Sequence, residues 1–176
     1  ASDVYKRQFP YIALMKVAII SDTHDNLPNV RSLVKKLKDE KVDLILHAGD
    51  IIAPFTLKEF QGFKLYFVFG NNDGERKLLR ETSRKLGFVA LEDFGSLEVD
   101  GKKFALIHGK DEEMVIALCK SGLYDVVVRG HTHKHEIKRV NDTLLINPGE
   151  VCGYLFGEAT YVIYDTEEDK ARLFTL

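Results

Sequence analysis

The sequence predicts an α/β fold, and three features of the chain lead to this expectation. From Met15 onward, short β-rich apolar runs alternate with segments of helical period, which is typical of layered α/β proteins. From Leu97 onward the pattern changes to hairpins, which favours mixed rather than purely parallel sheets. The 176 residues, 45% of them hydrophobic, fit one domain with a sizeable core. We therefore expect a single domain over residues 15–176.

The first half of this domain predicts three strand-helix units. The expected strands are residues 16–21, 43–47 and 64–69, and the expected helices begin near Pro28, at Pro54 and at Glu75. Proline suits the first turn of a helix, and Gly87 suits the end of the third one. The first helix also carries one apolar stripe at i, i+3, i+4, i+7 spacing: Val30, Leu33, Val34 and Leu37. Successive strand-helix units imply parallel strand pairing.

The second half predicts antiparallel structure. Asp100-Gly101 is a strong hairpin signal between residues 97–99 and 103–107, and a second hairpin turns at Asn141-Asp142. Between them we expect a helix at 112–120 and a strand at 125–128, and a final strand pair at 159–164 and 171–175.

Composition excludes several classes of partner. With 25 basic and 27 acidic residues the net charge is −2, so we expect neither extended nucleic acid nor a membrane surface as a partner. Cys119 and Cys152 lack Cys-x-x-Cys spacing, which argues against a disulfide framework and favours a cytoplasmic, reducing compartment. Residues 1–14 are interpreted as an N-terminal extension, either native or a tag or misassigned start, and we expect no chemistry there. A homo-oligomer is left open.

Polar clusters follow five of the expected strands, and each cluster adjoins or contains a glycine or a turn. The clusters are Asp22-Thr23-His24, Gly49-Asp50, Gly70-Asn71-Asn72-Asp73, His108-Gly109 and Gly130-His131-Thr132-His133. The carboxyl ends of strands form the crevice where open α/β sheets bind ligands. We therefore expect these clusters to converge on one site.

The converging side chains predict a metal centre. They are two carboxylates, one amide and four imidazoles: Asp22, His24, Asp50, Asn71, His108, His131 and His133. Nitrogen and oxygen donors without sulfur suit Mn, Fe, Ni, Co or Zn better than Ca or Mg. Seven side chains exceed the needs of one tetrahedral ion, so two ions sharing a bridging carboxylate are the economical interpretation.

Single motifs have plainer interpretations. Asp22 could cap a turn and His24 could be an ordinary loop histidine, whereas His131 and His133 alternate as they leave a strand and are expected to project to one side. Other residues receive secondary interpretations: His47 as a hydrogen-bonded core residue, His135 as a rim residue, Cys119 as core, residues 147–150 as a turn, and Asp25, Asn26, Asp73 and Arg76 as supporting residues or phosphate contacts.

The ordered clusters resemble those of the calcineurin-like metallophosphoesterase superfamily, in particular its small bacterial and archaeal phosphodiesterase branch. The resemblance implies a four-layer α/β/β/α sandwich and a phosphoesterase in which a hydroxide between two metal ions attacks a small phosphate ester, most often a diester. It implies one ion held by Asp22, His24, Asp50 and His133, and a second held by Asp50, Asn71, His108 and His131, with Mn or Ni favoured. The catalytic set would be Asp50, Asn71, Asn72 and His108.

One position departs from the superfamily pattern. Many members carry histidine where this chain has Asn72, and an amide has no titratable proton near neutral pH. General acid catalysis from this position is therefore not expected. The alternative function is a non-catalytic scaffold for protein binding, as in the retromer subunit of this fold, but that subunit lacks the aspartate that this chain retains at Asp50.

Overall fold

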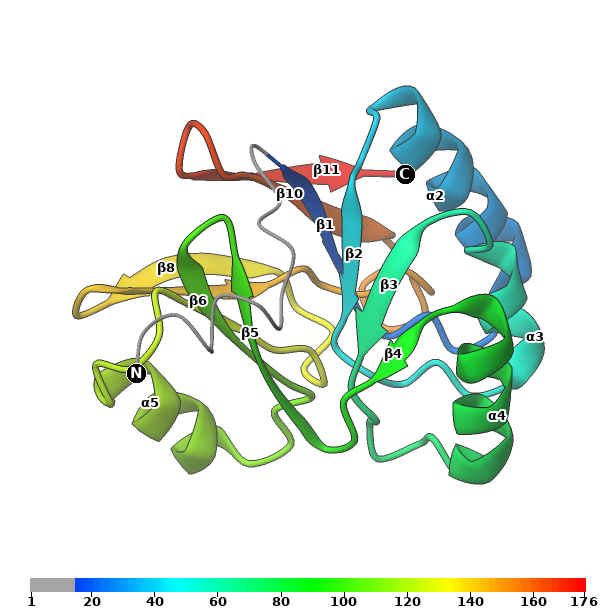
Figure 1. The fold of residues 1–176 in the computed structure, drawn as a ribbon, viewed down its shortest axis with the longest axis horizontal. Coiled ribbons are helices and arrows are strands. Elements are labelled where there is room, and N and C mark those ends of the chain that lie inside the picture. The colour runs from blue at the N-terminus through cyan, green and yellow to red at the C-terminus, as the bar shows by residue number, and fades with distance from the viewer. Residues whose placement is uncertain (1–14) are drawn as a thin grey trace, which may run out of the picture.

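Two β-sheets pack face to face in the computed structural model, which describes residues 15–176 (Figure 1). The expected N-terminal extension, residues 1–14, lies outside the described residues. The first sheet has the order β11-β10-β1-β2-β3-β4, in which β1 to β4 are parallel and β10 and β11 are antiparallel. Its strands are β1 (Lys16–Ile20), β2 (Leu44–His47), β3 (Lys64–Phe67), β4 (Val89–Ala90), β10 (Thr160–Asp165) and β11 (Lys170–Thr175).

The second sheet has the order β5-β6-β7-β9-β8. Strands β6, β7 and β9 are parallel, and β5 and β8 are antiparallel edge strands, so both sheets are mixed. The strands are β5 (Phe94–Val99), β6 (Lys102–Ile107), β7 (Val126–Val128), β8 (Glu136–Val140) and β9 (Thr143–Asn147).

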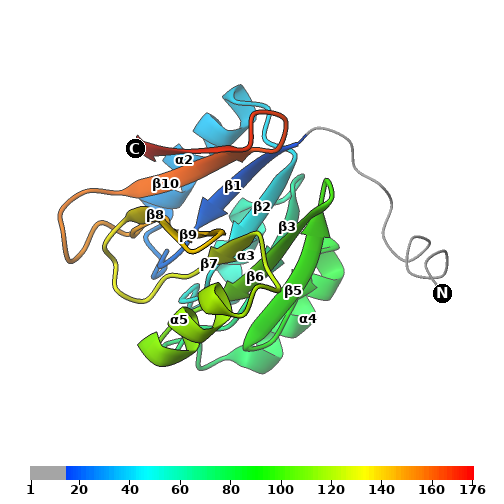
Figure 2. The same cartoon turned by 90° about the vertical axis from the view of Figure 1, so that its left-hand side faces the viewer.

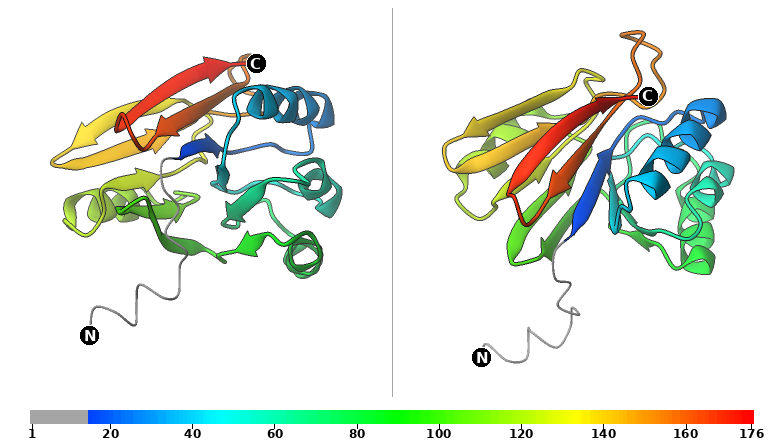
Figure 3. Two further views of the ribbon diagram at one scale, coloured as in Figure 1. Left: turned by 45° about the horizontal axis from the view of Figure 1, so that its top comes forward. Right: turned by 90° about the horizontal axis from the view of Figure 1, so that it is seen from above.

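Helices cover the outer faces of both sheets (Figures 1 and 2). Helices α2 (Leu27–Asp39), α3 (Pro54–Glu59) and α4 (Arg76–Leu86) lie on one side, and α5 (Glu112–Lys120) lies on the other (Figure 3). The expected α/β/β/α arrangement with mixed sheets is therefore confirmed. Within residues 15–176, no helix combines the length and the apolar character needed to cross a bilayer.

The core follows the two-residue period of the strands. In β1, Val17 and Ile19 are buried between the sheets, whereas Ala18 and Ile20 are buried against the helices. The apolar stripe of α2 reaches the same helix-side core through Val30, and its start is capped by Asn26, whose side chain accepts a hydrogen bond from the backbone of Asn29.

Three strand predictions need correction. Strand β1 ends at Ile20 and β3 at Phe67, one and two residues before the expected ends, because the chain turns there into the polar loops. Strand β5 begins at Phe94, three residues before the expected Leu97. Strand β4 was not expected, since its two residues are too few to show a periodic pattern. The element order that places the five polar clusters at strand ends is unaffected.

Candidate metal centre

The backbone is left-handed at five of the seven expected ligands. Their φ angles are +53° at Asp22, +40° at His24, +58° at Asp50, +69° at His131 and +62° at His133. A positive φ is uncommon for residues other than glycine, and such residues gather at functional sites. The sharp turns at the ends of β1, β2 and β7 therefore direct these side chains toward a common region.

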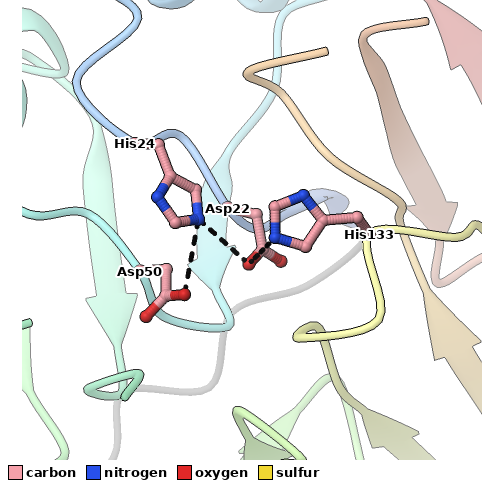
Figure 4. Close-up of side chains that lie close together, drawn as sticks. All are labelled: Asp22, His24, Asp50 and His133. Atoms are coloured by element: carbon pink, nitrogen blue, oxygen red, sulfur yellow. Dashed lines mark ion pairs between the residues drawn. The ribbon is translucent and has the colours of Figure 1, made fainter. Parts of the chain in front are cut away.

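Four side chains form the first group of donor atoms, Asp22, His24, Asp50 and His133 (Figure 4). Nε2 of His24 lies 3.6 Å from Oδ1 of Asp22 and 3.4 Å from Oδ2 of Asp50. Nε2 of His133 lies 3.3 Å from the same Asp22 oxygen. One donor atom from each residue falls within 4.8 Å of the others, which is close enough for a single cation.

Two atoms of this group are buried without a hydrogen-bond partner. They are Oδ1 of Asp22 and Nε2 of His24. Buried polar atoms are nearly always satisfied, so an unsatisfied oxygen and nitrogen that face the same point indicate an ion-binding position. The donor chemistry of the residues present therefore fits a divalent metal ion.

A second group surrounds the amide oxygen of Asn71. Nε2 of His108 lies 2.9 Å and Nδ1 of His131 lies 3.0 Å from Oδ1 of Asn71, and Oδ2 of Asp50 lies 3.4 Å from Nε2 of His108. Nδ1 of His108 is 2.7 Å from the carbonyl oxygen of Ala48, to which it donates. In the neutral ring this leaves a lone pair on Nε2 facing the Asn71 oxygen, an arrangement of two donor atoms that a bound cation would satisfy.

The carboxylates of the centre attract positive charge. The nearby carboxylate of Asp22, and then that of Asp50, raises the pKa of His24 to about 9 against the opposing effect of burial. Burial opposes ionisation of Asp50, yet the neighbouring His108 and His24 and the backbone of Asn72 hold the pKa of Asp50 well below its usual range. A site whose carboxylates favour positive charge in this way suits divalent cations.

Two glycines allow the loops to approach the carboxylates. A Cβ atom at Gly70 would lie 2.1 Å from Oδ1 of Asp50, and one at Gly130 would lie 1.9 Å from Oγ of Ser21. The Ser21 hydroxyl in turn donates to Oδ2 of Asp22. Any side chain at either glycine would therefore displace a carboxylate or its partner.

Asp73 joins the loops that follow β2 and β3. Its carboxylate is buried and accepts hydrogen bonds from the backbone nitrogens of Asp50, Gly70 and Ile52, at 2.9, 2.7 and 2.7 Å. We had expected Asp73 to be a supporting residue or a phosphate contact. All three of these bonds go to the loop backbone, so its observed contacts are those of a supporting residue.

Asn72 lies against Asp50 rather than free in the site. Its backbone N–H donates to Oδ1 and its side-chain amide donates to Oδ2 of Asp50, at 2.9 and 2.8 Å. The assignment of Asn72 to the catalytic set stays a prediction, but its observed contacts orient the expected bridging carboxylate.

Glu150 was missed by the sequence interpretation, which treated residues 147–150 as a turn. Its buried carboxylate lies 2.5 Å from Nδ1 of His133. Burial opposes ionisation of Glu150, but backbone N–H donors, first that of Phe156, and His133 lower its pKa below the ordinary value. The signal was available, because Glu150 follows β9, a strand parallel to β7, and the strand-end rule applies to β9 as well.

The argument for His131 and His133 was wrong in its geometry. Both residues have positive φ and neither lies in a strand, and they contact different groups, His131 near Asn71 and His133 near Asp22. The convergence is produced by the turn after Gly130 instead of by strand alternation.

The secondary interpretations have mixed outcomes. His47 is fully buried and hydrogen-bonded to Thr23 and Gly49, so the core interpretation is confirmed, as it is for buried Cys119. His135 is exposed beside the site, as a rim residue would be.

Asp25, Asn26 and Arg76 serve local structure. Asp25 accepts hydrogen bonds at the start of α3, Asn26 caps α2, and Arg76 pairs with Asp93. None of the three contacts a donor atom of the two groups through a hydrogen bond or ion pair within residues 15–176.

Two packed sheets with nitrogen and oxygen donor atoms at their strand ends are typical of metal-dependent hydrolases. Comparisons with known proteins identify the family. The family model for the calcineurin-like phosphoesterase superfamily domain matches residues 15–169, and the chain belongs to this superfamily. Membership implies divalent metal ions at the centre.

Relatives of known name agree with this membership. The chain is 44% identical over 165 residues to a phosphodiesterase of Methanocaldococcus jannaschii, covering 92% of this chain and 99% of the relative. It is 32% identical over 144 residues to a probable metallophosphoesterase of Methanothermobacter thermautotrophicus, covering 77% and 76%.

Solved structures give the same fold. The structure of an archaeal phosphodiesterase superposes with a TM-score of 0.88 at 43% identity, covering 92% of this chain and all of that one. The structure of Vps29 of Chaetomium thermophilum superposes with a TM-score of 0.68 at 15% identity over 92% and 96% of the two chains, which shows the fold alone.

Proposed function

We propose that the chain is a metal-dependent phosphodiesterase that hydrolyses small phosphate esters. The observation that carries the proposal is the pair of donor groups that share Asp50, with the unpartnered Asp22 oxygen and His24 nitrogen in one and the facing lone pairs of Asn71 and His108 in the other. The similarity to the phosphodiesterase of Methanocaldococcus jannaschii supports the choice of diesters.

The donor residues form two groups, and each group would hold one ion. Asp22, His24, Asp50 and His133 would hold one, and Asp50, Asn71, His108 and His131 would hold the other. Four imidazoles in the donor set favour Mn or Ni over Mg. When bound, the ions would activate water and neutralise charge on the phosphoryl oxygens.

The chain's own residues fix the bridging position. Asn72 donates to both carboxylate oxygens of Asp50, and the backbone nitrogen of Asp50 donates to Asp73. Oδ2 of Asp50 is thereby held 3.4 Å from Nε2 of His24 in one group and 3.4 Å from Nε2 of His108 in the other. No side-chain nucleophile is needed, and Asn72 offers no proton to a leaving oxygen. Esters with good leaving groups are therefore the preferred substrates.

The alternative of a non-catalytic scaffold has weaker support. A scaffold has no need for Asp50 and six further donors, and unpaired buried polar groups are costly without an ion. The two cysteines are unpaired and buried, which supports a reducing, cytoplasmic location for the enzyme.

The test is metal analysis of freshly purified protein together with hydrolysis of bis(4-nitrophenyl) phosphate and 4-nitrophenyl phosphate. We expect transition metal in the protein and faster hydrolysis of the diester. A protein that binds no Mn, Ni, Fe, Co or Zn and hydrolyses neither ester would overturn the proposal.

A further inference from the structure

Glu150 connects the expected ligand His133 to a neighbouring loop, residues 153–157. Its Oε2 lies 2.5 Å from Nδ1 of His133, while Oε1 accepts hydrogen bonds from the backbone nitrogens of Leu155 and Phe156 at 2.9 and 2.7 Å. The residue is 1% exposed. A buried carboxylate with this many donors on it has little freedom to move.

The backbone on either side of Glu150 fixes it further. The backbone nitrogens of Val151 and Cys152 donate to the carbonyl oxygens of Ser21 and Asp22, at 3.1 and 3.0 Å, so this segment runs beside the end of β1. The thiol of Cys152 also donates to Oε2 of Glu150 at 3.3 Å. Glu150 is thus anchored to the same strand end that presents Asp22.

These contacts determine which nitrogen of His133 carries the proton. An ionised carboxylate accepts hydrogen bonds and cannot donate them, so Nδ1 of His133 must be the donor. In the neutral ring this leaves the lone pair on Nε2, the atom 3.3 Å from Oδ1 of Asp22. Histidines that bind metals commonly have their other nitrogen fixed in this way.

From this geometry we infer that Glu150 is a positioning residue, which holds His133 in the Nδ1–H tautomer and in the ring orientation that presents Nε2 to the metal centre. This inference deepens the proposed function and rests on it for the identity of the bound group. The same carboxylate holds the loop that carries Tyr154, whose ring centroid is 6.5 Å from that of His24. The ring orientation of His133 and the position of this loop therefore depend on one acceptor.

The principal test compares Glu150→Gln with Glu158→Gln. The first variant replaces the acceptor by an amide that can donate to Nδ1 and favour the other tautomer. Glu158 is exposed in the same segment and, among residues 15–176, forms no hydrogen bond or ion pair with His133, so its variant makes the same change of charge without removing a contact of that ring. By titration calorimetry with Mn²⁺ we expect about 10- to 100-fold weaker binding for Glu150→Gln. Glu158→Gln should stay within about twofold of the wild type.

A second measurement needs no variant at Glu150. Nitrogen-15 spectra of the metal-free wild type, at a pH where the rings are neutral and with His133 assigned by comparison with His133→Asn, should show protonated Nδ1. The Nε2–H tautomer in the wild type would overturn the inference, even if Glu150→Gln fails to fold. Unchanged Mn²⁺ affinity in a folded Glu150→Gln would also overturn it. If the wild type bound no metal, the proposed function would fail, while the tautomer would still decide the role of Glu150.

Discussion

Asn72 binds both oxygens of Asp50, with its backbone nitrogen 2.9 Å from Oδ1 and its amide nitrogen 2.8 Å from Oδ2. The side chain that occupies the position of a frequent superfamily histidine is therefore engaged with the expected bridging carboxylate. It can orient Asp50, but it has no proton to give to a departing alkoxide. The rate of hydrolysis should therefore depend on the leaving group.

We predict that the rate of diester hydrolysis falls steeply as the leaving-group pKa rises. Without an acid at residue 72, the departing oxygen must carry its negative charge, so aryl esters should react much faster than alkyl esters. The measurement is log kcat/KM against leaving-group pKa over a series of aryl and alkyl diesters.

The variant Asn72→His should flatten that dependence. It should help poor leaving groups more than good ones, by up to about 10²-fold where the ring reaches the leaving oxygen. A flat wild-type slope with chemistry shown to be rate-limiting would mean that another group supplies the proton, and this role of Asn72 would be abandoned.

Asp50→Asn should nearly abolish activity and reduce metal occupancy. The bridging position needs a full negative charge to hold two cations close together, and a neutral amide oxygen is a weaker ligand. Metal content and diester hydrolysis measured on the same preparation test this. Asp142→Asn, at an exposed hairpin turn, is the matched control, and two bound ions with wild-type turnover in Asp50→Asn would contradict the bridge.

Removal of metal should silence the enzyme reversibly. After treatment with a strong chelator and dialysis, Mn²⁺ or Ni²⁺ should restore diester hydrolysis better than Mg²⁺, because imidazole nitrogens favour transition metals and Mg²⁺ prefers oxygen ligands. Full activity in chelator, or restoration by Mg²⁺ alone, would point to a different site.

Asp73→Asn should destabilise the metal-free protein by about 1–3 kcal/mol, since the amide leaves a buried backbone donor facing another donor. Urea unfolding gives the free energy of unfolding. The control is Asp93→Asn, whose side chain is 74% exposed and pairs only at the surface with Arg76, and it should change stability by less than about 0.5 kcal/mol. Equal losses of unfolding free energy in the two variants would exclude this stabilising role of Asp73.

His47 should make the protein sensitive to acid. Burial lowers its pKa from 6.5 to about 3, so between these values the unfolded chain binds a proton that the folded chain does not. The free energy of unfolding should therefore fall as the pH drops below about 6.5, by up to about 1.4 kcal/mol per pH unit from this residue. His47→Gln, compared by urea unfolding at pH 8 and pH 5, should show a smaller difference; an equal difference would exclude His47 as the source.

Much of the fold was predictable because its signals are local. The apolar stripe of α2 and the Asp100-Gly101 turn are each formed by residues close together in the sequence. Local signals of this kind predicted most of the helices and strands. Strand β4 gave no such signal, because two residues show no period and its pairing with β3 depends on the chain around it. The four layers came from the resemblance to the superfamily, and the packing confirmed them.

The sequence by itself determined which donor types follow the strands, since Asp22, Asp50 and Asn71 directly follow apolar runs and the strand-end rule needs nothing more. Only the tertiary structure decided that Glu150 contacts His133 and that Asp73 binds the backbone of Asp50. Those contacts join segments that are separate in the sequence, and each depends on loops after neighbouring strands, β2 and β3 or β7 and β9, which lie side by side only once their sheet has formed. A local sequence pattern can predict that a residue follows a strand, but the packing of the loops determines which atoms its side chain contacts.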